Sequence, residues 1–233
     1  MASLAHIWQD FTHLLFPYNC AGCSYALDEN EHIICKHCIE NLPRTLYWTY
    51  PDNTVAATFY GRLPLHNACS FLYFTKGGKV QEMLHHLKYS NRPEVGQMLG
   101  RLFGEHLSAS VYQDIDCIVP VPLHAKRLKV RGYNQCDHIA LGLAESMQKQ
   151  YLTTAVQRIK ANESQTKKGR YDRWINVHEL FRVVEPQRIA NKHVLLVDDV
   201  VTTGATLEAC AKALLLVPGV KLSVVTIACP SIV

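Results

Sequence analysis

The sequence predicts an α/β fold with a parallel, doubly wound sheet and a small metal-binding module ahead of it. Stretches with helical periodicity alternate with short apolar runs, as crossover helices alternate with parallel strands. The run Val194–Val197 contains four large apolar residues in succession, which is typical of a strand buried on both faces. Four cysteines are concentrated between residues 20 and 38. We therefore assign residues 1–49 to the module and residues 50–233 to the main domain.

The composition is that of an ordinary globular protein. The chain has 233 residues, 48% of them hydrophobic and 19% charged, and its net charge of +4 is too mild to indicate nucleic-acid binding by itself. No apolar stretch approaches the ~20 residues that span a bilayer, and the first residues lack the pattern of a secretory signal. Nine cysteines without an export signal favour a reducing compartment, so we expect a cytoplasmic protein without a membrane span.

The individual elements follow from local patterns. A helix is expected over residues 4–15, where apolar residues recur at helical spacing; it either packs on the rest of the chain or docks a partner or membrane. Apolar, β-branched and aromatic runs predict the strands: Val55–Tyr60, Ala68–Phe74, Cys117–Leu123, Ala155–Lys160, Val194–Val197 and Leu222–Ala228. Apolar residues at helical spacing predict the remaining helices: 80–87, 95–107, Asn134–Gln150 and Leu207–Leu214.

The amino-terminal cysteines form two C-x-x-C pairs with an eleven-residue spacer. One such pair is compatible with redox chemistry, whereas two pairs favour a structural metal site. Four sulfur ligands complete a tetrahedral zinc site and leave no position for a catalytic water. We therefore expect structural zinc on Cys20, Cys23, Cys35 and Cys38.

The strongest functional signal follows the apolar run at 194–197. Two carboxylates, Asp198 and Asp199, stand at the carboxyl end of this strand, where ligands bind in open α/β sheets. A loop of hydroxyl residues around one glycine then leads into a helix, whose amino terminus presents backbone N–H groups and a positive dipole end to a phosphate. This order suits a polyhydroxylated ring beside a terminal phosphate, such as ribose 5-phosphate. The candidate phosphate-binding residues are Thr202, Thr203, Gly204, Ala205 and Thr206.

The segment from Val194 to Thr206 resembles the phosphoribosyl-pyrophosphate (PRPP) motif of type I phosphoribosyltransferases. The resemblance implies that Asp198 and Asp199 hold the ribose hydroxyls at the catalytic centre, that residues 202–206 wrap the 5-phosphate, and that Mg²⁺ accompanies PRPP. It also implies a type I phosphoribosyltransferase-like fold for the main domain. The plainer interpretation is a strand end with two solvated aspartates and an ordinary turn, which leaves the order of the parts unexplained.

A basic segment follows the proline-ended strand and carries four cations within six residues. A guanidinium group matches phosphate oxygens in a bidentate way, and lysine adds a point charge. Beside the PRPP-like motif, we therefore expect Arg127 and Arg131 to bind pyrophosphate, while Lys126 and Lys129 can face water. Lys88, at the end of a predicted helix, is a weaker candidate for the same role. A solvated basic loop is the alternative interpretation.

Four features stand in order along the chain: the two cysteine pairs, Pro120–Leu123, Arg131–Gln135 and the PRPP-like motif. This combination resembles the ComF family of bacterial competence proteins over nearly the whole chain. The resemblance implies a phosphoribosyltransferase-like domain behind a zinc finger, and a role in the uptake or processing of single-stranded DNA during natural transformation. It also makes the polar segment 158–181 a candidate lid, although a plain solvated loop explains that segment equally well.

Two functions of different classes follow from these features. The first is Mg²⁺-dependent transfer of a phosphoribosyl group from PRPP to an unidentified acceptor. The second is a non-catalytic module that binds PRPP or single-stranded DNA among competence proteins, with Tyr133, Tyr171 or Trp174 stacking on bases. A glutamine-dependent amidotransferase is disfavoured, because the chain begins with methionine, alanine and serine rather than a cysteine nucleophile. Neither the acceptor nor the oligomeric state follows from the sequence.

Overall fold

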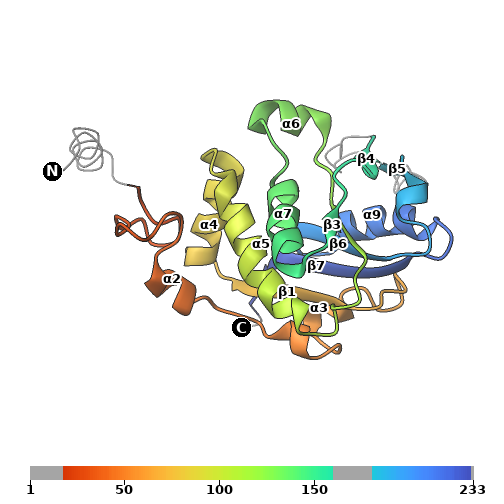
Figure 1. Ribbon diagram of the computed structural model, residues 1–233, viewed down its shortest axis with the longest axis horizontal. Helices are drawn as coiled ribbons and strands as arrows, with labels where there is room; N and C mark the ends of the chain where they lie inside the picture. Colours follow the sequence, from red (N-terminus) through yellow and green to blue (C-terminus); the bar gives the residue numbers. More distant parts are fainter. Residues whose placement is uncertain (1–17, 160–179, 232–233) are drawn as a thin grey trace.

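The computed structural model of the chain describes residues 18–159 and 180–231. The predicted helix at 4–15 and nearly all of the candidate lid at 158–181 lie outside these residues. The main strands are β1 (Ala68–Phe74), β2 (Cys117–Pro120), β3 (Gln150–Tyr151), β6 (His193–Val200) and β7 (Lys221–Pro230). They form one sheet in the order β1-β7-β6-β2-β3, and every neighbouring pair is parallel (Figure 1).

The helices are α2 (Lys36–Glu40), α3 (Thr54–Ala57), α4 (Lys79–Tyr89), α5 (Pro93–Ser108), α6 (Ala125–Arg131), α7 (Gln135–Met147) and α9 (Ala205–Leu215), with 3₁₀ turns η1 (Tyr47–Thr49) and η2 (Pro186–Arg188). The chain leaves β2 toward β3 at one edge of the sheet and leaves β6 toward β7 in the opposite direction. Right-handed crossovers therefore place α7 and α9 on opposite faces. The sheet is doubly wound, as the sequence predicts.

Helices α5 and α7 approach each other unusually closely because glycines stand at their contact. A Cβ atom on Gly100 would lie 2.2 Å from the carbonyl oxygen of Ile139, and one on Gly142 would lie 2.0 Å from that of Gln97. Figure 1 shows the two helices side by side, with α4 next to α5. This packing fixes the start of α7 against the carboxyl end of β2, where polar side chains gather.

Two predicted strands differ from the structure. The predicted strand Val55–Tyr60 is wrong, because the side chain of Asn53 accepts hydrogen bonds from the amides of Val55 (3.0 Å) and Ala56 (3.1 Å) and begins helix α3 there. The predicted strand Ala155–Lys160 exists as β4 (Val156–Arg158), but it pairs antiparallel with β5 (Phe181–Val183) outside the main sheet. The edge position of the sheet belongs to β3 instead.

The amino-terminal module packs against the main domain. Cys20, Ile34 and Cys38 are buried and belong to the same hydrophobic cluster as the core of the sheet. The Arg92 side chain at the start of α5 donates a hydrogen bond to the carbonyl oxygen of Asn19 (2.9 Å). A module boundary near residue 49 remains a prediction. Among the described residues, no helix has the length and apolar character needed to cross a membrane.

Candidate functional site

A cavity of about 210 Å³ opens at the carboxyl ends of β2 and β6. These are the neighbouring strands from which the chain turns in opposite directions, and the ligand crevice of an open α/β sheet lies at such a point. Five of the predicted site residues line this cavity together, although they come from α6, β6 and α9: Arg127, Arg131, Asp198, Asp199 and Thr206. The structure thus brings the carboxylate pair and the basic segment to one place.

The two carboxylates have different partners. Asp198 Oδ1 accepts hydrogen bonds from the backbone amide of Asp199 (2.9 Å) and from the thiol of Cys136 (3.3 Å). Asp199 Oδ2 accepts a hydrogen bond from Gln135 Nε2 (2.8 Å) and lies 3.0 Å from Lys88 Nζ. The buried Asp199 is therefore fixed by side chains from α4 and α7, whereas the half-buried Asp198 has, among the described residues, only a thiol and the neighbouring amide as donors.

The environment of Asp198 favours its neutral form. Burial raises the pKa of Asp198 to about 7, and the negative charge of Asp199 acts in the same direction. The Asp199 amide, the Cys136 thiol and the charge of Lys88 oppose this increase. A carboxyl that titrates near pH 7 changes charge readily when a cation arrives beside it, because an adjacent positive charge favours the ionised form.

Gln135 is a site residue that sequence reasoning missed. Its amide oxygen accepts a hydrogen bond from the Arg131 guanidinium, while its nitrogen donates to Asp199. It therefore joins the predicted pyrophosphate side of the cavity to the predicted ribose side. Its one sequence signal is its place at the end of the string Arg131–Gln135. Lys88, a weaker candidate from sequence for binding pyrophosphate, lines the cavity and pairs with Asp199, and its role toward pyrophosphate stays a prediction.

The loop between β6 and α9, residues 201–204, has a backbone that depends on glycine. Gly204 is buried, has φ +73° and immediately precedes α9. A Cβ atom there would lie 2.7 Å from Cε1 of Phe59, which is itself 1% exposed. The first amides of α9 have no intrahelical partners, which makes this end suitable for an anion. Thr202, Thr203 and Ala205 are exposed in this stretch.

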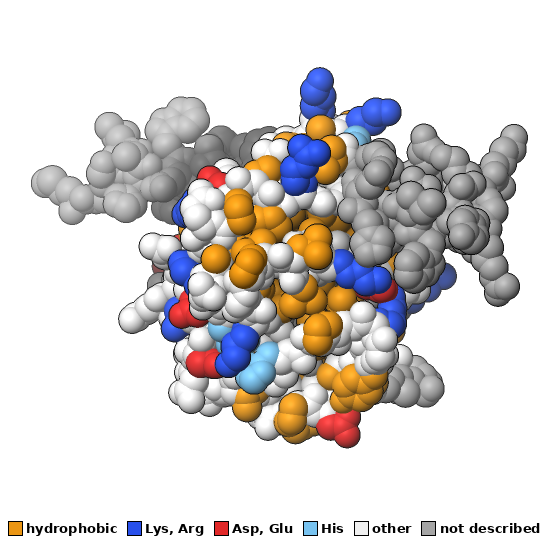
Figure 2. Space-filling view, turned by 90° about the vertical axis from the view of Figure 1, so that its right-hand side faces the viewer, with side chains coloured by type: hydrophobic (Ala, Val, Ile, Leu, Met, Phe, Trp, Pro, Cys, Tyr) orange, Lys and Arg blue, Asp and Glu red, His pale blue; other side chains and the backbone are white. Residues whose placement is uncertain are grey.

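The predicted basic loop is a short helix, α6. The Nδ1 atom of His124 accepts a hydrogen bond from the Lys126 amide (3.2 Å) and caps its start, and Gly132 ends it with φ +83°. None of its residues is buried. Arg131 Cζ lies 5.5 Å from the ring centre of Tyr89, whereas Arg127 is exposed. Figure 2 shows Lys and Arg side chains projecting from the top of the molecule, where Figure 1 places α6.

Arg158 adds a third arginine to the cavity. Its Cζ lies 5.3 Å from the ring centre of Phe181, and its Nε has no hydrogen-bond partner among the described residues. Burial lowers the pKa of Arg158, and the positive charge of Arg127 adds to this effect. Sequence reasoning assigned this residue only to the edge of the lid segment. The reason is that its place in the cavity depends on the β4–β5 pairing, for which the local pattern has no signal.

The four amino-terminal cysteines converge at a second site. Their sulfur atoms all lie within 4.8 Å of one another, and Cys23 and Cys35 are 3.8 Å apart. Zn–S bonds of about 2.3 Å in a tetrahedron give sulfur separations of about 3.8 Å. Burial raises the pKa of Cys20, but hydrogen bonds from the amides of Cys35 and Gly22 outweigh burial and bring the value to about 7. Burial raises the pKa of Cys35 and of Cys38, so the case for zinc rests on the convergence of the four sulfur atoms.

A histidine cluster lies at the opposite end of β6 from the cavity. The ring of His193 is buried, with Nε2 at 2.9 Å from Ser223 Oγ and Nδ1 at 3.2 Å from Asp114 Oδ2. This order of carboxylate, imidazole and hydroxyl resembles a catalytic triad, but Ser223 is 0% exposed and no substrate reaches it. The cluster therefore joins β6 to β7 and to the turn before β2.

Part of this chain is similar to known proteins. The phosphoribosyl transferase domain family matches residues 137–230, which include β6, the following loop and α9. DNA utilization protein YhgH of Escherichia coli K12 is 36% identical over 140 residues, which cover 58% of this chain and 61% of that protein. Competence protein F of Haemophilus influenzae is 36% identical over 100 residues, 42% of this chain and 44% of that protein.

Competence protein ComFC of Bacillus subtilis is 29% identical over 143 residues, 61% of this chain and 56% of that protein. The matched region thus spans about three fifths of the length of the relatives with the longest alignments. A glutamine PRPP amidotransferase from B. subtilis has a solved structure that covers 61% of this chain at 18% identity, with a TM-score of 0.42.

Proposed function

We propose that this chain, a homologue of the competence and DNA utilization proteins with a phosphoribosyl transferase domain, binds PRPP with Mg²⁺ in the cavity between β2 and β6. The observation that carries the proposal is the juxtaposition of a carboxylate pair, a helix amino terminus and three arginines at the switch point of the sheet. Asp198 and Asp199 hold the ribose hydroxyls. Residues 202–206 surround the 5-phosphate, and Arg127 and Arg131 contact the pyrophosphate.

The arrangement suits transfer of the phosphoribosyl group to an acceptor. In this reaction the bond between ribose C1 and the pyrophosphate oxygen breaks, and an acceptor atom forms a new bond to C1. Positive charge develops on the ring while the departing pyrophosphate gains negative charge. Arg127, Arg131 and Arg158 stabilise the departing anion, and the carboxylates stabilise the ring. The loop at 202–206 holds the 5-phosphate, which orients the sugar without reacting.

The residues present suit Mg²⁺ as a companion of PRPP. Carboxylate oxygens of Asp198 and Asp199 are hard ligands that match this ion. The thiol of Cys136 lies in the same cluster, but burial raises its pKa well above the usual value and keeps it protonated. When bound, Mg²⁺ neutralises charge on the pyrophosphate. A cation held there would favour the ionised form of Asp198, whose pKa burial raises to about 7.

Calorimetry with PRPP and Mg²⁺ tests the binding proposal. We expect Asp199→Asn to weaken PRPP binding at least tenfold, since the variant loses a charged hydrogen-bond acceptor for the ribose. Asp52→Asn is the matched control, because Asp52 bonds the exposed Tyr60 hydroxyl (2.8 Å) and should leave binding unchanged. Micromolar binding that is the same in Asp199→Asn and the wild type would refute the assignment.

A second candidate is a module that binds single-stranded DNA, and the relatives are named for DNA utilization and competence. The exposed cations of α6 support it, since they provide the charge that phosphate backbones require. Tyr133 supports it less, because its ring packs on His138 and its hydroxyl donates to the Leu87 carbonyl. Tyr171 and Trp174 lie outside the described residues. Gel-shift assays across a salt series discriminate: absence of a shift at low salt removes this candidate.

We also propose that the four-cysteine cluster holds structural zinc. The cluster packs on the main domain, so the metal stabilises the whole chain rather than a free module. Metal analysis of the purified protein should give one zinc per chain, and Cys23→Ser should lose it with a lower melting temperature. Cys229→Ser, at a buried cysteine of β7, is the control and should keep the zinc. A zinc site of this kind fits a reducing compartment such as the cytoplasm.

A further inference from the structure

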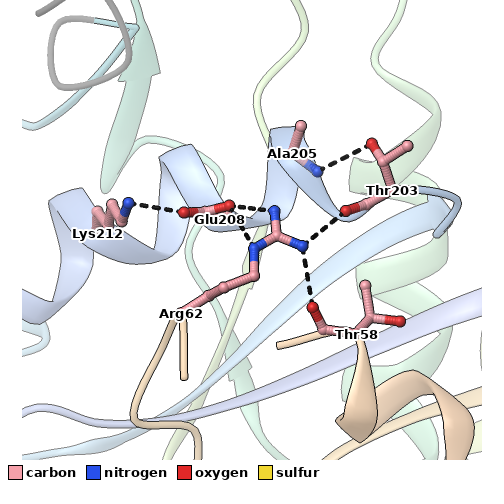
Figure 3. A network of polar contacts seen from close by, with 6 residues as sticks. All are labelled: Thr58, Arg62, Thr203, Ala205, Glu208 and Lys212. Carbon is pink, nitrogen blue, oxygen red and sulfur yellow. Dashed lines mark hydrogen bonds and ion pairs between the residues drawn. The ribbon is translucent and has the colours of Figure 1, made fainter. Parts of the chain in front are cut away.

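Arg62, which lies in the turn after α3, contacts the loop that precedes α9. Its Nη1 donates hydrogen bonds to the carbonyl oxygens of Thr58 (2.9 Å) and Thr203 (3.0 Å), as Figure 3 shows. Its Nε (3.0 Å) and Nη2 both donate to Glu208 Oε2 in the first turn of α9. Lys212 Nζ holds the other oxygen of Glu208 at 2.7 Å. One guanidinium thus connects three points around the loop.

The contact with Thr203 sets the direction of the next amide. In a planar trans peptide, the C=O of Thr203 and the N–H of Gly204 point in opposite directions. Glycine tolerates both orientations of this peptide, because its φ is almost free. Arg62 selects the orientation in which the carbonyl faces the guanidinium and the Gly204 N–H faces away from it. If this peptide turned over, a carbonyl oxygen would point to the side where the amide now stands.

The same side chain also controls a charge near the helix amino terminus. Glu208 stands within the first turn of α9, where a free carboxylate would repel a bound phosphate. Burial raises the pKa of Glu208, but hydrogen bonds from Lys212 and Arg62 outweigh burial and keep it low, so the carboxylate stays ionised and paired. Arg62 and Lys212 carry two positive charges against one negative charge. Together, Arg62, Lys212 and Glu208 therefore leave a net positive charge beside the loop.

We propose that Arg62 is a positioning residue for a phosphomonoester site at the start of α9: it fixes the Thr203–Gly204 peptide so that the Gly204 amide faces the phosphate. The proposal rests on the binding of PRPP proposed above and deepens it. Arg62 is not among the residues that line the cavity, so it acts through the loop and not by touching the ligand. A Cβ atom on Gly204 would lie 2.7 Å from Phe59 Cε1 and 3.1 Å from Thr58 Cγ2, so the end of α3 and the turn after it stand close behind the loop and support it.

The test uses Arg62→Met in the full chain with three ligands measured by calorimetry: ribose 5-phosphate, PRPP with Mg²⁺, and inorganic pyrophosphate with Mg²⁺. We expect the affinities for ribose 5-phosphate and PRPP to fall roughly tenfold, the size of a lost hydrogen bond to a charged group. The affinity for pyrophosphate should not change, because its arginines lie on the other side of the cavity. The Arg62 side chain is 37% exposed, so the variant should fold.

Three further variants separate the contributions. Arg62→Lys keeps the positive charge but loses the planar guanidinium group that donates to several acceptors at once. It should recover only part of the affinity for ribose 5-phosphate. Glu208→Gln removes the carboxylate while Arg62 still reaches Thr203, and should bind at least as well as the wild type. Arg101→Met is the matched control, because Arg101 Nε (3.1 Å) and Nη2 (2.7 Å) hold Glu145 Oε2 between α5 and α7. It should leave all three affinities unchanged.

The outcomes are distinct. Wild-type affinity of Arg62→Met for ribose 5-phosphate overturns the role of Arg62, and so does an equal loss for pyrophosphate, which would indicate general weakening of the fold. Full recovery by Arg62→Lys means that charge alone acts, which overturns the positioning argument. If the wild type binds neither ribose 5-phosphate nor PRPP, the binding proposal itself fails and this inference falls with it.

Discussion

The two sides of the cavity that we propose to bind anions are built differently. On one side, the loop before α9 contains the buried Gly204, and the ring of Phe59 packs against this glycine. The Arg62 guanidinium donates a hydrogen bond to the carbonyl oxygen of Thr203 in the same loop. On the other side, α6 has no buried residue, and Val130 within it is 91% exposed. The first side is fixed by contacts from residues far away in the sequence. The second projects into solvent and is attached through its ends and through Arg131.

This difference in rigidity suits the two ends of the proposed ligand, PRPP. A fixed loop holds the part of a ligand that must not move during a reaction, which for PRPP is the 5-phosphate. A helix with few contacts opens at little cost in free energy, so α6 suits the part that must admit and release the pyrophosphate. Matched substitutions on the two sides should therefore change the free energy of unfolding and the ligand affinity by different amounts.

Glycine-to-alanine substitutions should show the largest contrast. Gly204→Ala meets both a left-handed backbone and the Phe59 ring 2.7 Å away, so we expect it to lower the free energy of unfolding by about 3 kcal/mol. Gly132→Ala at the end of α6 meets the same backbone strain at φ +83° but nothing within 4 Å, and should cost only about 1 kcal/mol. Urea unfolding of both variants measures the difference. Equal losses would show that the loop is no more fixed than α6.

The carboxylate between the two sides should give a pH-dependent effect. Burial raises the pKa of Asp198 in the folded chain to about 7, above its unfolded value near 4. The folded state therefore binds the proton more tightly, and the stability that protonation provides is lost as pH rises from about 4 through 7. Asp198→Asn removes this loss. Between pH 4 and pH 8, the free energy of unfolding of the variant should rise relative to that of the wild type by on the order of 2 kcal/mol, a figure reduced for the partial exposure of Asp198.

Melting temperatures of the wild type and Asp198→Asn across this pH range test that expectation. The same variant should bind PRPP more weakly, since it cannot ionise toward the ribose and the cation. Stabilisation with loss of binding is the pattern of a strained functional site. Parallel pH profiles for the two proteins would contradict the raised pKa of Asp198.

The arginines of α6 should separate binding from stability. Arg131 donates to Gln135 and stacks near Tyr89, whereas Arg127 is exposed. Replacing either with methionine should weaken pyrophosphate binding by roughly tenfold. Arg131→Met should also lower the free energy of unfolding by about 1 kcal/mol, and Arg127→Met should leave it unchanged. A stability loss in Arg127→Met would mean that α6 is held more firmly than its exposure indicates.

The fold could be predicted where the cause was local. Four consecutive apolar residues at 194–197 suffice for a strand buried on both faces, because burial on both faces leaves no room for alternation. The predicted strand Val55–Tyr60 failed because one residue outside it, Asn53, accepts two amide hydrogen bonds and starts a helix. The β-branched and aromatic residues of this segment favour a strand less strongly than the Asn53 cap favours a helix.

The candidate site shows the same limit. Asp198 and Asp199 could be found because a strand end and a glycine loop mark them in the sequence. Arg62 could not, because it is 141 residues away from Thr203 and no local pattern records the contact. Arg158 likewise enters the cavity through a strand pairing. The residues proposed to contact the ligand belong to a motif, whereas the residues that hold this motif in place are set by tertiary packing.

The smallest effect is expected at the most exposed apolar residue of α6. Val130→Ser should change the free energy of unfolding by less than about 0.5 kcal/mol, because a side chain that is 91% exposed has no packing to lose. If α6 moves onto the pyrophosphate and buries this residue, the variant should instead lose PRPP affinity at unchanged stability. Calorimetry and urea unfolding on one preparation decide between the two. A measurable loss of stability would show that α6 packs on the domain, and the contrast between the two sides would disappear.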